Sequence, residues 1–440
     1  MAVSGSAVEW LGWSFNIHPR TVTGIQLFNV QYKKERIAYE LSMQDILVLY
    51  SGGAPDDYFK SYFDNGWSIG AASTPLVRGV DCPQDAVYMN SNTYIVGKDQ
   101  GVSINDSICI FEHRNSIPLH RHYSSSFLDG SYRYAFSMPD SVLIVRQILT
   151  LWNYDYIFDY EFHQNGVIEL KVSSTGYVAV TTNLDGSTNS HGYVINDGWK
   201  ATANLHQHIF NFRLDLDIDG INNNFKTIDI SKTTPTKHDF SGAKTWSQII
   251  MQESVIDNEQ DAAIRYDFSR PKLYVMYDNK TSKQRGYRIQ SNNFHNPVLS
   301  DSSPLLAGGA SWTKYQLAVT KFNESETTTA SAFVQGDPFN PAINFDDFIE
   351  NNDKLTNEDL VAWVTVGLHH IPTYEDLPVT STPGKTLSVV LAPFNYFERD
   401  PAIHSRDAAV FWHEVIQKPD GILYQNDTCL VPNVKPSVYP

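Results

Sequence analysis

The amino-acid sequence predicts an all-β protein, built as one large antiparallel β-sandwich. Aromatic residues, which favour strands, make up 13% of the 440 residues. Apolar runs of strand length are separated by Gly, Asn, Asp and Pro, the residues typical of turns. No repeat, low-complexity block or linker divides the chain, so we expect a single domain over residues 1–440.

Seven segments carry the strand pattern, and only two short segments suggest helices. The predicted strands are residues 24–32, 141–149, 166–172, 176–182, 209–218, 272–277 and 386–392. The predicted helices are residues 346–352 and 357–361. Alternation is clearest in residues 212–218, where apolar residues take every second position. Asp215 and Asp217 share the opposite face of that strand, which makes this face a candidate cation site.

The acidic balance of the chain excludes one class of partner. There are 33 Lys and Arg residues against 49 Asp and Glu residues, a formal net charge of -16. Nucleic-acid surfaces need clustered cationic side chains that displace counterions, so we expect no nucleic-acid partner. No run approaches the roughly 20 apolar residues of a membrane helix, and residues 1–5 do not form a signal peptide. We therefore expect no membrane segment in this chain.

The cysteines and the glycosylation sequons favour an extracellular setting. Cys82, Cys109 and Cys429 lack the C-x-x-C spacing of zinc and redox sites. The N-x-[ST] sequons begin at Asn105, Asn279, Asn323 and Asn426. Together these features predict a secreted glycoprotein, made in a compartment where disulfides persist.

Two pairs of histidines have the spacing of metal ligands on a strand. In His206-Gln207-His208 the two imidazoles point the same way, with Cα atoms about 7 Å apart, so both can hold one metal. His120-Arg121-His122 has the same spacing. Spacing alone does not decide between the pairs, nor does it exclude histidines that merely line one polar face of a strand.

A polar and aromatic segment, Leu-Trp-Asn-Tyr-Asp-Tyr at residues 151–156, follows an apolar strand. By composition it could be a surface turn with tyrosines at a sheet edge. However, Asn153-Tyr154-Asp155-Tyr156 resembles the signature of copper amine oxidases, in which the first tyrosine of the motif is oxidised to topaquinone. The resemblance implies that Tyr154 is the topaquinone precursor and that Asn153 belongs to the catalytic motif.

The resemblance extends to separated motifs and implies a role for each. The His-Ile-Pro segment at residues 370–372 matches the family's third copper ligand, so His206, His208 and His370 would bind copper(II), and the pair at residues 120 and 122 would not. Tyr-Phe-Asp-Asn-Gly at residues 62–66 matches the segment of the catalytic base. The implied roles are catalytic base for Asp64, hydrogen bonding to the quinone for Tyr50, and control of the substrate channel for Tyr62 and Trp152.

The same resemblance implies structural sites and a fold. It implies a disulfide between Cys82 and Cys109, and a β-sandwich of the family's large "supersandwich" type. A calcium site would use Asp215, Leu216, Asp217, Asp359 and Leu360, with the leucines offering backbone oxygens. A second calcium site would use Glu253, Asn351 and Asp353. Compared with the family's usual organisation, we expect this chain to begin near the catalytic domain and to lack the small N-terminal α/β domains.

The function implied by the resemblance is oxidation of primary amines. Such an enzyme converts an amine, O₂ and water to an aldehyde, ammonia and hydrogen peroxide, and it acts as a homodimer. Cys429 would then either pair with its symmetry mate or stay free. The motifs concern only the reacting CH₂–NH₂ group, so they do not reveal the rest of the substrate. Two alternatives remain: a zinc hydrolase with three histidines, and a catalytically silent copper- and calcium-binding adhesion or structural relative.

Overall fold

The computed structural model describes most of the chain. The described residues are 1–53, 55–94, 98–123, 134–182, 190–196, 198, 200–234, 236–237, 245–267, 271–280, 282–292, 299–329, 331–404, 409–414 and 421–424. Asn426 and Cys429 lie outside these ranges, so the predictions that involve them remain predictions. Within the described residues, no helix is long and apolar enough to span a membrane.

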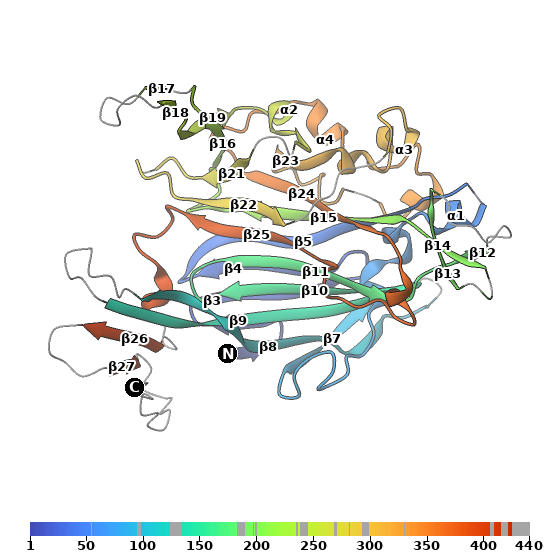
Figure 1. Ribbon diagram of the computed structural model, residues 1–440, viewed down its shortest axis with the longest axis horizontal. Helices are drawn as coiled ribbons and strands as arrows, with labels where there is room; N and C mark the ends of the chain where they lie inside the picture. The colour runs from blue at the N-terminus through green and yellow to red at the C-terminus, as the bar shows by residue number, and fades with distance from the viewer. Residues whose placement is uncertain are drawn as a thin grey trace.

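Two large antiparallel sheets pack face to face, which confirms the predicted fold class (Figure 1). The first sheet has the order β1-β2-β3-β4-β5-β15-β24-β23-β20, with β6 paired to β5. Its strands are β1 (Ala2–Ser4), β2 (Ala7–Trp10), β3 (Trp13–Arg20), β4 (Gly24–Tyr32), β5 (Glu35–Tyr50), β6 (Tyr62–Phe63), β15 (His206–Leu216), β20 (Ile264–Arg265), β23 (Tyr315–Lys321) and β24 (Leu360–His370).

The second sheet has the order β19-β16-β21-β22-β25-β11-β10-β9-β26-β27, and β7 and β8 extend it beside β9. Its strands are β7 (Val87–Thr93), β8 (Val102–Tyr123), β9 (Tyr134–Leu151), β10 (Tyr154–His163), β11 (Ile168–Gly176), β16 (Asn224–Lys232), β19 (Ile249–Ile256), β21 (Lys272–Tyr277), β22 (Gly286–Asn292), β25 (Thr386–Phe394), β26 (Ala409–Glu414) and β27 (Gly421–Tyr424).

Short elements decorate the sandwich. They include a small sheet of β12 (Thr181–Thr182), β13 (Gly192–Asn196) and β14 (Ala201–Asn204), a pair of β17 (Thr236–Lys237) and β18 (Thr245–Trp246), and the helices α1 (Pro55–Lys60), α2 (Glu259–Ala262), α3 (Pro304–Ala307) and α4 (Asp347–Glu350). In Figure 1, α1 lies beside β12, β13 and β14 at one end of the sandwich, whereas β26 and β27 lie at the other end.

The core lies between the two sheets and is built from alternate residues of central strands. On β10, Tyr156, Phe158 and Tyr160 face inward and are buried. Phe210 of β15 in the opposite sheet meets them, with its ring centroid 5.3 Å from that of Tyr156. Burial of each such ring stabilises the fold by about 1.5–3 kcal/mol, so these two strands are held firmly against each other.

Most predicted elements are confirmed, and two are wrong in part or in full. The predicted strand at residues 176–182 fails because β11 ends at Gly176 and residues 177–180 form no strand. The predicted helix at residues 357–361 is wrong: Asn357 has a left-handed φ of 58°, and β24 begins at Leu360. Backbone pairing of β24 with strands on both sides outweighs the weak helical pattern of five residues.

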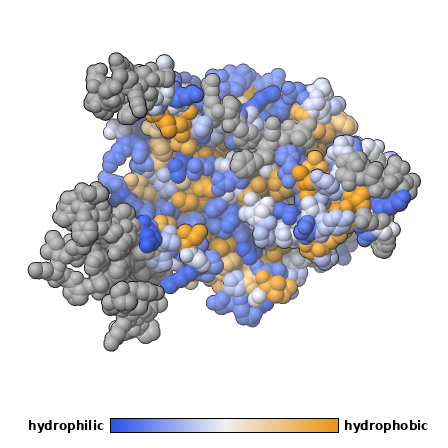
Figure 2. All heavy atoms as spheres, in the orientation of Figure 1, coloured by the Kyte–Doolittle hydropathy of each residue, from blue (hydrophilic) through white to orange (hydrophobic). Residues whose placement is uncertain are grey.

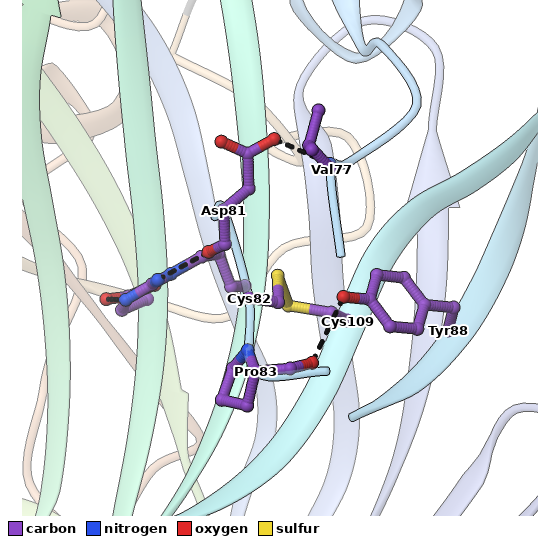
Figure 3. Close-up of a disulfide and its surroundings, with 8 residues drawn as sticks. Val77, Asp81, Cys82, Pro83, Tyr88 and Cys109 are labelled. Carbon is purple, nitrogen blue, oxygen red and sulfur yellow. Dashed lines mark hydrogen bonds and ion pairs between the residues drawn. A yellow bond between two sulfur atoms is a disulfide. The ribbon is translucent and has the colours of Figure 1, made fainter. Parts of the chain in front are cut away.

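The predicted disulfide between Cys82 and Cys109 is confirmed (Figure 3). It ties the segment before β7 to β8, and it closes a loop with a sequence separation of 27 residues. A loop of this length corresponds to about 3–4 kcal/mol of stabilisation through the unfolded chain. The same segment is held from a second side, because Arg146 of β9 donates a hydrogen bond to the backbone oxygen of Asp81 at 2.8 Å.

The surface alternates between hydrophilic areas and small apolar patches (Figure 2). The edge strand β19 carries several exposed apolar side chains, with Ile249 80% and Met251 72% exposed. An edge strand with such side chains offers unpaired backbone groups and apolar surface together, which favours contact with another chain.

Candidate functional site

Three buried histidines meet where two neighbouring strands of the first sheet end. His206 and His208 begin β15, and His370 ends β24. The antiparallel register places His370 directly opposite His206. One ring nitrogen from each of the three histidines lies within 4.8 Å of the others, so a single ion could be bound by all three.

Hydrogen bonds fix the orientation of each imidazole. His206 Nδ1 donates to the backbone oxygen of Asn204 at 2.8 Å, and His370 Nε2 lies 3.1 Å from an Asp376 carboxylate oxygen. His208 Nδ1 lies 2.7 Å from the Tyr156 hydroxyl. Each ring therefore keeps its other nitrogen for the shared centre, the arrangement usual for metal-ligating histidines.

The electrostatics of the centre suit a metal ion. Burial, followed by repulsion from His370, lowers the pKa of His206 to about 3. Burial also holds the pKa of His208 well below its usual value and lowers the pKa of His370. All three rings are therefore neutral near pH 7, which is the form that binds metal. His208 Nε2 is buried without a hydrogen-bond partner, so it fits the position of a ligand.

Tyr154 points directly into the histidine centre from the second sheet. Its hydroxyl lies 2.6 Å from both His206 Nε2 and His370 Nδ1. Tyr50, the last residue of β5, stacks on the His206 ring with centroids 4.4 Å apart. The predicted quinone tyrosine, its predicted neighbour and the histidines are thus brought together from strands far apart in the sequence.

A tight turn delivers Tyr154 to this position. Leu151 of β9 pairs with Tyr154 of β10, so the turn has two residues, of which Trp152 has a φ of 58°. Asn153 donates from its side chain to the backbone oxygen of Tyr177 at 2.7 Å. Gly176 lies close to the backbone of this turn. A Cβ at position 176 would be 2.3 Å from the backbone oxygen of Asn153, so only glycine fits.

A cavity of about 360 Å³ leads to Tyr154. Besides Tyr154, its lining includes five other predicted site residues, namely Tyr50, Tyr62, Asp64, Trp152 and Asn153. Trp152 is exposed, and Tyr62 packs against Trp67 with ring centroids 4.9 Å apart. The arrangement suits a small molecule with a polar end that reaches Tyr154 and an apolar remainder against aromatic rings.

Asp64 lies at the start of the 3-10 turn η1 (Asp64–Trp67) and is almost fully buried. Burial, with repulsion from Asp45, holds the pKa of Asp64 well above its usual range. A carboxyl with a raised pKa in a dry cavity is suited to act as a base near neutral pH. Sequence reasoning missed Asp45, although an acid within the apolar strand pattern of residues 43–49 was a usable signal.

Three carboxylates named for the first predicted calcium site lie together at the far end of β15. Carboxylate oxygens of Asp215, Asp217 and Asp359 lie within 4.8 Å of one another. Leu216 pairs directly with Leu360 of β24, which sets the two chain segments side by side. Burial raises the pKa of Asp215 to about 7 and that of Asp359 to about 6, so a divalent cation would relieve repulsion there.

Other predicted or competing residues are not gathered into such a group. Glu253 pairs with Lys226 at 2.9 Å, whereas the Asn351 amide donates to Asp353 at 3.3 Å. His120 pairs with Asp400 at 2.9 Å, and the side chain of its neighbour at position 122 lies outside the described part of the structure. The second calcium site therefore stays a prediction.

Removal of one histidine should release the metal. We expect His208→Ala to weaken copper binding by more than the roughly 10–100-fold typical of losing an outer hydrogen-bond partner, because a direct ligand is lost. Metal analysis after dialysis against a competing chelator measures the effect. His120→Ala is the matched control and should keep its copper; loss of copper there, with retention in His208→Ala, would contradict the assignment.

The fold and the site together indicate the class of protein. Three neutral, buried imidazoles face a tyrosine inside a β-sandwich and could hold one metal ion, and imidazole ligands suit copper(II) among other transition metals. The model of the family described as copper amine oxidase, enzyme domain, matches residues 2–411. The chain belongs to the copper amine oxidase family.

Individual relatives agree with this assignment. A putative copper-containing amine oxidase of Margaritifera margaritifera is 37% identical over 413 residues, covering 92% of this chain and 52% of that protein. The copper-containing diamine oxidase of Homo sapiens is 37% identical over 418 residues, covering 93% of this chain and 54% of that protein. This chain thus spans about half the length of the curated relatives it matches.

Solved structures show the same architecture. The crystal structure of Aspergillus nidulans amine oxidase aligns with a TM-score of 0.83 at 30% identity, covering 97% of this chain and 57% of that chain. The Pichia pastoris lysyl oxidase aligns with a TM-score of 0.85 at 26% identity, covering 97% of this chain and 58% of that chain. The β-sandwich is therefore the enzyme-domain fold of this family.

Proposed function

We propose that this protein is a primary-amine oxidase that converts a primary amine, O₂ and water to an aldehyde, ammonia and hydrogen peroxide. The observation that carries the proposal is the position of the Tyr154 hydroxyl, 2.6 Å from two of the three buried histidines. The same cavity is lined by Asp64, a buried carboxyl suited to proton transfer. Both features are what the family's chemistry requires of this chain.

The residues present fit the two cofactors of the family. His206, His208 and His370 would hold copper(II), and Tyr154 would be the residue converted to topaquinone. When formed, this quinone supplies the electron sink that ordinary side chains lack. The register of β15 with β24 fixes the positions of the histidines, and Tyr154 of β10 reaches them from the opposite sheet.

The protein's own groups then account for binding and proton transfer. The aromatic wall of the cavity, including Tyr62 and Trp152, excludes water and holds the apolar part of the amine. Asp64 accepts the proton from the carbon next to the amine nitrogen, because its raised pKa makes it a stronger base than an exposed carboxylate. Asn153 holds the turn that presents Tyr154.

The remaining predictions complete the proposal. Asp215, Asp217 and Asp359, with the backbone oxygens of Leu216 and Leu360, would bind calcium.

The protein would be an extracellular glycoprotein, and it would act as a homodimer. The exposed apolar edge strand β19 supports the dimer, since a second chain could cover it. Sedimentation as a monomer at micromolar concentration would refute the dimer.

Titration with phenylhydrazine under anaerobic conditions tests the function directly, because this reagent reacts with the quinone carbonyl. A coloured adduct is expected, followed by peroxide release when a panel of primary amines and O₂ is added. Bound zinc without visible absorption would favour a hydrolase. Copper without adduct formation or peroxide release would favour a silent relative.

A further inference from the structure

A second buried carboxyl lies beside the proposed catalytic base. Asp45 is on β5 and is 0% exposed, and Asp64 is 5% exposed. Asp45 Oδ1 accepts a hydrogen bond from the Ile46 backbone at 2.8 Å and a longer one, at 3.4 Å, from the Asn65 backbone. Asn65 directly follows Asp64, so Asp45 contacts the turn that carries the base.

A β-bulge directs Asp45 to this place. Along the pairing of β5 with β15, Asn211 is opposite Asp45 and Phe212 is opposite Met43, so Gln44 is an extra residue. A bulge re-aims the side chains beside it and is common next to active sites. Without the extra residue, the alternation of β5 would place Asp45 on the other face of the strand.

No positive charge accompanies these two carboxyls. None of the ion pairs formed by the described residues includes Asp45 or Asp64. One carboxylate oxygen of each, Oδ2, is buried without a hydrogen-bond partner. The polar groups that contact Asp45 are the uncharged backbone N–H groups of Ile46 and Asn65. Two adjacent charges in such surroundings would be strongly unfavourable, so both groups cannot readily be ionised together.

We propose that Asp45 is a positioning residue for Asp64, which holds the Asn65 backbone and is coupled to Asp64 so that the pair carries at most one negative charge at neutral pH. The inference rests on the proposed role of Asp64 as base. It means that the proton affinity of the base is raised, beyond the effect of burial, by a neighbour that is not among the residues lining the cavity.

The electrostatics agree with this geometry. Burial raises the pKa of Asp45 to about 8, and repulsion from Asp45 is the second cause, after burial, that raises the pKa of Asp64. The other titratable groups that feel the charge of Asp64 are Tyr50, Tyr62 and Tyr156, whose raised pKa values keep them neutral. Lys60 and Asp56 of α1 line the same cavity but are paired with each other at 2.9 Å.

The test is an infrared titration of protonated carboxyl groups in the full chain as purified, with difference spectra between the wild type and each variant. In Asp45→Asn the repulsion is gone, so the ionised form of Asp64 is favoured. The pH midpoint of the Asp64 titration should therefore fall by about one unit or more. The rising limb of the kcat–pH profile should move to lower pH by a similar amount. Asp45→Glu keeps the charge and should retain two coupled steps.

Two further variants keep the test decisive. Coupling is reciprocal, so Asp64→Asn must lower the midpoint of Asp45 by the same amount. Asp278→Asn is the matched control, since Asp278 is also buried, accepts one backbone hydrogen bond at 2.7 Å and has a second oxygen without a partner. It should leave both midpoints unchanged.

Each outcome bears on one claim. An unchanged Asp64 midpoint in folded Asp45→Asn overturns the proposal. If that variant does not fold, an unchanged Asp45 midpoint in Asp64→Asn overturns it equally. The spectra need no turnover, so they separate this inference from the proposed function. If the two midpoints are coupled but Asp64→Asn keeps full turnover, the role of Asp64 as base is refuted. The inferred coupling between Asp45 and Asp64 would then still stand.

Discussion

Replacement of Tyr154 by phenylalanine is expected to abolish amine oxidation while copper stays bound. The variant lacks the phenolic oxygen that lies 2.6 Å from His206 and His370, so the quinone cannot form. The loss should be on the order of 10⁶-fold or more, because positioning alone cannot replace the chemistry of a cofactor. Peroxide release, visible absorption and copper content are the measurements.

Tyr160→Phe is the matched control for that experiment. Tyr160 lies on the same strand, is equally buried, and donates a hydrogen bond to the Ile25 backbone oxygen at 3.0 Å. Its replacement should cost about 1 kcal/mol of stability and leave turnover in place. Residual oxidation within about tenfold of the wild type in Tyr154→Phe would refute the assignment of the quinone tyrosine.

Asp64→Asn should form the quinone normally but lose proton abstraction. Loss of a positioned base typically reduces the rate by about 10²–10⁴-fold. Rapid anaerobic mixing with amine measures this step alone, because O₂ is absent. A normal rate would mean that another group is the base.

Unfolding should not explain the lost activity of Asp64→Asn. Burial raises the folded-state pKa of Asp64, so its ionisation opposes folding. The stability contributed by the protonated form is therefore full below the unfolded pKa of about 4 and is lost as pH rises towards the folded value. The neutral amide avoids that loss, so the variant should be at least as stable as the wild type at neutral pH, which a thermal melt can check.

The sequence predicted the sheets well because strand pattern and turn residues agree. Residues 24–32 and 272–277 match β4 and β21, where apolar stretches are bounded by turn residues at both ends. The prediction of a strand over residues 176–182 was wrong. The valines of this segment favour a strand, but β11 ends at Gly176, where the backbone of Asn153 approaches closely. The prediction of a helix over residues 357–361 was also wrong. The local preference of this segment for a helix is weak, and pairing of β24 with β15 and β23 favours a strand.

The candidate site could be predicted only in part. Spacing gave two equal histidine pairs, and only resemblance to a family favoured the pair at 206 and 208. The register of β15 with β24 places His370 beside them, and no local pattern contains that pairing. Asp45 was missed for the same reason, since its importance depends on a bulge in β5 and on a turn nineteen to twenty residues further along the chain.

The register between β15 and β24 also has a consequence for folding. His206 and His370 are 164 residues apart in sequence, and Tyr154 is 52 residues from His206. Contacts of such sequence separation form late and slowly, after much chain entropy has been lost. The metal can therefore be held by all three histidines only in a chain in which β15 and β24 have already paired in their native register. Copper binding would then stabilise that paired state selectively, and copper content would distinguish correctly paired chains from compact but misregistered ones.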